Sequence, residues 1–279
     1  MRKQRLAFSR RELKMLAKRL MFHPICMRVT LLLVGLQVSF VGLRYLLGAT
    51  LTYGVASLAQ YGDTVSGIYF NSEGFSILFR MDLTQMVLAI PVTYAQLIRF
   101  VVFSVVVLLI LAPIRLGVME QYWSMLRGSG EAGVRPVLRW FRQGGKFGKA
   151  VVVELLLGAG VRLAGILATV PSLYLFYLFY TTTPSLLQIG ATVLAIAALV
   201  FTFWLHSIFL PVRYCLCAHP EYSLGQVFRR GLDSAKGFRG AFFGFRLSYI
   251  LWFLVSQVTY GAMDIFVTPY TSLGGMLFL

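Results

Sequence analysis

Long uninterrupted apolar runs are the feature that most constrains the fold of this chain. A helix needs about 20 apolar residues to cross the hydrocarbon core of a bilayer. Hydrophobic residues make up 58% of the chain and charged residues only 13%, against about 25% charged in globular domains. We therefore expect an all-α, polytopic membrane helix bundle of about five transmembrane helices. The runs are Val29 to Gly48, Ala95 to Ile114, Ala150 to about Tyr180, Ile189 to Leu210 and Leu247 to Val267.

The positions of the cationic residues predict how the chain is oriented. Most of the 26 Lys and Arg residues fall before the first run, between the second and third, or between the fourth and fifth. Positively charged loops stay cytoplasmic, so the amino terminus is expected inside and the carboxyl terminus outside. The net charge of +16 does not indicate nucleic-acid binding, because these cations flank the apolar runs and suit anionic lipid headgroups.

Three basic amphipathic helices are predicted at the cytoplasmic ends of the runs. Ser9 with Glu12, and Ser223 with Gln226, have the spacing of a capping box ahead of an apolar periodicity. A third segment follows Pro136, and its Trp140 suits the headgroup level. Such one-sided basic helices are typical of the membrane interface. Their expected headgroup contacts are Arg10, Arg11, Lys14, Lys18, Arg139, Arg142, Arg229, Arg230 and Lys236.

The pattern divides the chain into a basic cytoplasmic helix, residues 1–28, and a single transmembrane domain, residues 29–279. The outer segment 49–94 is rich in Tyr, Gly, Ser and Thr and is expected to form short interfacial helices. A sixth span over residues 78–94 stays open. The motifs "LAPIRLG" and "FLPVRYC" each place an Arg two residues after a Pro, which favours a tandem repeat of residues 95–180 and 189–268.

Residues near both ends of the chain support a family resemblance. The carboxyl-terminal positions are Pro220, Glu221, Ser234, Lys236, Gly237, Ser248, Trp252, Pro269 and Tyr270, and the amino-terminal ones are Leu13, Lys14, Ala17 and Lys18. With these residues the chain resembles an uncharacterised bacterial integral-membrane family, the domain of unknown function 975. The resemblance implies a multi-pass membrane architecture and no particular activity.

Arg162 and Glu154 are the candidate functional residues within the apolar runs. Arg162 lies about 12 residues, or roughly 18 Å, into the third run, and charges at that depth usually face a partner or a wet cavity. Structural pairing with another helix, snorkelling to water and a ligand or ion pathway stay open for it. For Glu154, a surface contact with Lys146 or Lys149 and proton coupling are the two alternatives. Pro113, Pro171 and Pro211 are candidate hinges.

No catalytic, metal or cofactor site is predicted. Cys215, Cys217 and His219 alternate near a span end, but a closed zinc site needs four converging ligands. The ten Asp and Glu residues are spread over both sides, so a pair of carboxylates for acid–base work is not expected.

The sequence thus favours a non-enzymatic protein of the bacterial cytoplasmic (inner) membrane. It would be a scaffold or accessory component that acts on lipids or on a partner membrane protein through its basic cytoplasmic face. A partner protein and a homo-oligomer are both compatible with that role. The alternative is a transporter or channel for a small anionic or amphipathic solute, and a third hypothesis, a membrane enzyme acting on lipid, lacks convergent polar groups.

Overall fold

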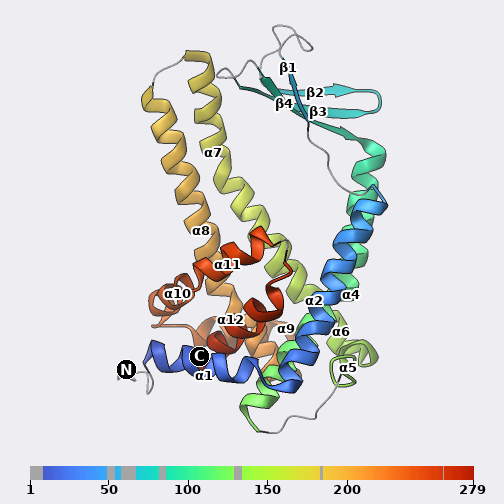
Figure 1. The fold of residues 1–279 in the computed structure, drawn as a ribbon, viewed down its shortest axis with the longest axis vertical. Coiled ribbons are helices and arrows are strands. Elements are labelled where there is room, and N and C mark those ends of the chain that lie inside the picture. The colour runs from blue at the N-terminus through green and yellow to red at the C-terminus, as the bar shows by residue number, and fades with distance from the viewer. Residues whose placement is uncertain are drawn as a thin grey trace. The chain divides into compact units, whose positions relative to one another are not determined.

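The computed structural model describes residues 9–48, 54–57, 67–81, 86–128, 134–182, 185–259 and 261–279 (Figure 1). The chain divides into two compact units. The first unit consists of Met1–Ser39, Leu108–Arg162 and Phe203–Leu279, and the second of Phe40–Val107 and Leu163–Thr202.

Four helical segments of the described residues are long and apolar enough to cross a membrane, which confirms a multi-pass helical bundle. They include α2 (Pro24–Leu46), α4 (Tyr94–Leu126) and α8 (Ser185–Ala218). The fourth is a continuous helix made of α6 (Gly144–Glu154), a π-helical segment (Leu155–Gly160) and α7 (Val161–Thr182). Many of their Leu, Val and Ile side chains are exposed, as expected where lipid is the solvent.

The fifth apolar run does not form one spanning helix. It contains α11 (Ile250–Val258), preceded by α10 (Arg239–Leu247) and followed by α12 (Asp264–Phe278). The nine residues of α11 extend only about 13 Å, less than half of a hydrocarbon core of about 30 Å. Gly261, at a φ of 84°, lies in the turn between α11 and α12.

The carboxyl-terminal helix returns towards the start of the chain. α12 packs against α1 (Arg10–Met21), α10 and α11. The run from Leu247 to Val267 therefore does not form the predicted fifth span, because a polar interruption after Val255 divides it into pieces too short to cross.

The outer segment forms a β-sheet within the second unit, so the prediction of short interfacial helices is wrong. The strands are β1 (Gly54–Ser57), β2 (Gly67–Asn71), β3 (Gly74–Met81) and β4 (Met86–Thr93). They are antiparallel, in the order β1-β4-β3-β2. Of the possible sixth span, residues 78–81 belong to β3 and residues 86–93 to β4, with Leu78 opposite Ala89, so these described residues are strands rather than a spanning helix. Pro91 lies in the part of β4 that pairs with β3, opposite Ser76.

A buried apolar cluster joins α4, α6, α8, α9 (Leu224–Ser234) and the short helix α5 (Arg139–Arg142) in the first unit. The helices approach closely at glycines. A Cβ atom on Gly231 of α9 would lie 2.6 Å from the Cα of Val212 in α8. The members of the cluster are Leu116, Trp140, Ala150, Val153, Leu157, Val212, Leu216, Cys217 and Val227.

Candidate functional site

The amino-terminal basic helix α1 has the predicted cap and packs its apolar face on the protein. The Glu12 carboxylate accepts a 2.6 Å hydrogen bond from the Ser9 amide, and the Ser9 hydroxyl accepts one of 3.3 Å from the Glu12 amide. The apolar residues Leu13 and Ala17 are buried. Protein therefore covers the part of the apolar face of α1 that carries Leu13 and Ala17. Leu16, which is 41% exposed, faces outward.

Helix α9 repeats this arrangement in the segment after Pro220. The Ser223 and Gln226 side chains form a capping box, and Val227 and Ala235 are buried on the core side. On the opposite side, the Arg230 guanidinium lies 4.3 Å from the centre of the Tyr222 ring. Both predicted capping boxes are confirmed.

The third basic segment is a single helical turn, shorter than predicted. Trp140 of α5 is fully buried and donates a 2.6 Å hydrogen bond from its indole N–H to the Glu120 carboxylate. It is therefore a core anchor, and the prediction that it lies at the headgroup level is wrong.

The predicted headgroup cations fall into two groups. Lys14 is half-buried: its Nζ donates a 3.3 Å hydrogen bond to the Ser248 carbonyl oxygen and lies 4.7 Å from the centre of the Tyr249 ring. This partial burial lowers the pKa of Lys14. The other eight side chains are exposed, and they are Arg10, Arg11, Lys18, Arg139, Arg142, Arg229, Arg230 and Lys236.

A buried ion cluster in the first unit gathers residues from three spanning helices. Glu154, at the end of α6, has a side chain only 2% exposed. Its Oε1 lies 2.7 Å from the Arg213 Nε, and its Oε2 accepts a 3.0 Å hydrogen bond from the Arg213 Nη2. The Nη1 of Arg115 lies 3.7 Å from the same Oε2. One carboxylate thus faces two guanidinium groups.

The partners of Glu154 differ from the predicted surface lysines. Lys149 donates a 3.0 Å hydrogen bond to the Pro220 carbonyl oxygen, and the Lys146 ammonium lies 5.8 Å from the centre of the Trp140 ring. Sequence reasoning missed Arg115 and Arg213 as site residues, although the matching Pro-x-Arg motifs marked them. Both motifs lie inside helices, with Pro113 in α4 and Pro211 in α8.

A π-helical segment begins directly after Glu154. Such segments insert an extra residue into a turn and are frequent at functional sites. Here the irregular turn separates Glu154 from Arg162, the other candidate functional residue. Arg162 is exposed on the first turn of α7, and Glu154 pairs with the other two arginines. Pro171, the third candidate hinge, lies inside α7.

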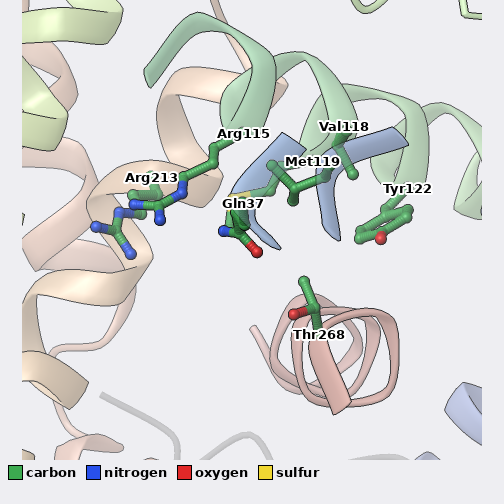
Figure 2. A pocket seen from close by; sticks show the side chains of 8 residues that line it. Gln37, Arg115, Val118, Met119, Tyr122, Arg213 and Thr268 are labelled. Atoms are coloured by element: carbon green, nitrogen blue, oxygen red, sulfur yellow. The ribbon is translucent and has the colours of Figure 1, made fainter. Parts of the chain in front are cut away.

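A cavity of about 150 Å³ lies beside the ion cluster. Its lining comes from α2, α4, α8 and α12, all within the first unit. Figure 2 shows the Arg115 side chain extending towards Arg213, with Gln37 near the centre and Thr268 on the facing helix. The lining residues are Leu33, Gln37, Arg115, Val118, Met119, Tyr122, Arg213 and Thr268.

A second buried cation, Arg246 of α10, lies in the same unit. Its Nη1 is 3.0 Å from His206 Nδ1 and donates a 2.9 Å hydrogen bond to the Ser207 hydroxyl. The guanidinium also lies 5.1 Å from the centre of the Phe203 ring. His206 of α8 is thus bonded to a side chain of another helix, α10.

The alternating Cys and His residues do not converge on one point. The Cys217 thiol is buried against the Leu116 carbonyl oxygen at 3.6 Å, whereas His219 stacks on Tyr222. Within the described ranges, no three His, Cys, Asp or Glu residues are placed to share a metal ion.

Comparison with known proteins gives no relative: no protein-family model, curated protein or solved structure matches this chain.

Proposed function

We propose that this chain is a non-enzymatic scaffold or accessory protein of the bacterial cytoplasmic membrane whose basic cytoplasmic face binds anionic phospholipid headgroups. The observation that carries the proposal is the way α1 and α9 are held. Each packs apolar side chains on the protein and leaves a row of Lys and Arg exposed.

Fixed helices favour such a role energetically. A free amphipathic segment must fold as it binds, whereas capped helices that are already packed do not lose that conformational entropy on binding. Each cation near an anionic membrane surface contributes about 1 kcal/mol, a value that falls with salt. The positive-inside rule places these rows on the cytoplasmic side, where anionic lipids face them.

Reconstitution with charge-reversed variants tests the proposal. The protein is purified with limiting detergent from mixed neutral and anionic lipid, and the bound lipid is identified by native mass spectrometry. We expect Arg229→Glu with Arg230→Glu to reduce the anionic share of retained lipid several-fold, and the reduction to shrink in high salt.

A charge-matched control keeps this experiment specific. Arg44→Glu with Arg99→Glu reverses the same charge at residues of the second unit and should leave lipid selection unchanged. Equal retention of neutral and anionic lipid by the unmodified protein would contradict the proposal. The unmodified protein could instead retain another membrane protein selectively. If the Arg229 and Arg230 variant lost that protein while its lipid retention stayed equal, the face would be assigned to a protein partner.

The alternative, a transporter or channel for a small anionic or amphipathic solute, is favoured by the cavity beside the Arg115 and Arg213 pair. Helices with internal prolines line this cavity, and a π-helical segment follows Glu154. Proteoliposomes loaded with a labelled anion test it. Release no faster than from protein-free vesicles would contradict transport of that anion, and unchanged release by Arg162→Ala would remove Arg162 from the pathway.

A further inference from the structure

The ion cluster beside the cavity carries an excess of positive charge. Glu154 offers one negative charge to Arg115 and Arg213. These three side chains together therefore carry one positive charge in excess, and several of the residues that line the adjacent cavity are apolar.

The two arginines differ in how completely they are satisfied. Arg213 is 13% exposed, donates one 3.0 Å hydrogen bond from its Nη2 to Glu154 Oε2, and has its Nε 2.7 Å from Glu154 Oε1 as an ion contact. Arg115 is 38% exposed, and its nearest contact to Glu154 is 3.7 Å, too long for a hydrogen bond. A guanidinium has five N–H donors, so Arg115 retains most of its capacity for an anion.

The cavity suits a small anionic group. Gln37 adds two amide donors and Thr268 a hydroxyl donor from the facing helices. Its volume of about 150 Å³ is that of a cavity able to hold a molecule as large as benzene, which exceeds a phosphate group. Glu154 lies only four residues after the start of the third apolar run, about 6 Å along the axis, so the site is near the cytoplasmic end of that run.

We propose that this cavity binds an oxyanion of the phosphate class, held by Arg115 and oriented by Gln37 and Thr268. Glu154 keeps Arg213 in place and leaves Arg115 available. The oxyanion neutralises the excess charge of the cluster. It belongs either to the headgroup of an anionic lipid or to a free cytoplasmic solute. This site is separate from the basic surface of α1 and α9 and does not depend on it.

Titration of the full-length protein in neutral detergent tests the site with two probes. Inorganic phosphate represents the free anion, and dihexanoyl phosphatidate represents a lipid phosphate. Isothermal titration calorimetry at constant ionic strength measures both. We expect at least one probe to bind and Arg115→Gln to weaken its binding by about tenfold or more, because a charged hydrogen-bonding pair is lost. Thr268→Val should weaken binding to a smaller extent.

The controls separate a built site from general attraction to a basic protein. Arg127→Gln removes a guanidinium that stacks over Trp123 outside the cavity, and it should bind both probes as the unmodified protein does. Arg229→Glu with Arg230→Glu should leave the titration with inorganic phosphate unchanged. Phosphatidate can also bind the basic surface, so for this probe the comparison is between Arg115→Gln and Arg127→Gln.

Several outcomes would overturn the proposal. They are no binding of either probe, equal binding by Arg115→Gln, and equal weakening by Arg127→Gln. If Arg115→Gln does not fold, Arg115→Lys replaces it, since Lys keeps the charge and loses the planar guanidinium. Unchanged binding by Arg115→Lys and unchanged binding by Thr268→Val, each measured as a single variant, would then also contradict the site. Binding of phosphatidate without phosphate assigns the site to lipid, and binding of both assigns it to the oxyanion itself.

Discussion

Replacing Glu154 by Gln should destabilise the protein more than any substitution of an exposed acid. Glu154 is 2% exposed and lies 2.7 Å from the Nε of Arg213, itself only 13% exposed. Removing one partner of a buried ion pair typically costs about 3 to 5 kcal/mol, because the other charge stays buried without compensation. The Gln amide oxygen can still accept one hydrogen bond, so we expect the lower end, about 3 kcal/mol.

Reversible unfolding in mixed micelles, followed by circular dichroism, measures this loss of unfolding free energy. Glu221→Gln is the matched control, because the Glu221 side chain is 63% exposed and its loss should leave the unfolding midpoint unchanged. The double variant Glu154→Gln with Arg213→Gln should recover part of the loss, since the more deeply buried of the two guanidinium groups is then removed and Arg115, which is 38% exposed, is the one left without this partner. A cost below about 0.5 kcal/mol, the level of ordinary surface substitutions, would refute the reasoning, as would strictly additive effects of the two substitutions.

Three further predictions concern the basic helices and the junctions that hold them. Gly231→Ala should cost about 1 to 3 kcal/mol of unfolding free energy by overpacking, because the new Cβ would lie 2.6 Å from the Val212 Cα. The control Gly225→Ala, with no atom within 4 Å of its Cβ, should cost nothing. Equal midpoints of the two variants in thermal unfolding would contradict this. Ser223→Ala should cost about 1 kcal/mol through loss of the cap, seen as faster amide exchange in the first turn of α9. Hydrogen bonds from Ser9 lower the pKa of Glu12 below 4.5. The stabilisation of α1 by the Glu12 carboxylate should therefore be complete above pH 4.5 and be lost as the pH falls through the lowered pKa of the folded protein. Amide exchange at Ser9 measures this, and Glu12→Gln should remove the pH dependence.

The parts of the fold that local chemistry determines were predictable from the sequence. A capping box needs only two side chains three positions apart, and both boxes occur at the predicted residues, Ser9 and Ser223. The apolar faces of α1 and α9 also follow from periodicity alone. What periodicity does not reveal is the neighbour of such a face. Val227 is fully buried against protein, where the sequence predicted an interface with lipid.

The sheet and the division of the fifth run are hard to predict from the sequence for different reasons. Residues 74–81 alternate only in part between larger and smaller or polar side chains, as in Phe75, Ser76 and Ile77, and so short a period does not outweigh the composition of the segment. The fifth run is long enough to span a membrane when its length alone is considered. Ser256, Gly261 and Asp264 interrupt it, and in the structure the Ser256 hydroxyl donates a hydrogen bond to the Asp264 carboxylate across the turn.

The Glu154 cluster depends on tertiary packing, and this explains why sequence spacing could not identify it. Arg115 and Arg213 are 98 positions apart in the sequence. Each lies two residues after a proline, Pro113 or Pro211, and both contact the carboxylate of Glu154. The two Pro-x-Arg motifs match in sequence and differ in structure, because Glu154 contacts Arg213 at two points and Arg115 at none within hydrogen-bonding distance. Two cations that share a single acid leave one charge to be neutralised from elsewhere. The cavity between α4 and α12 gives a small anion a place to do so.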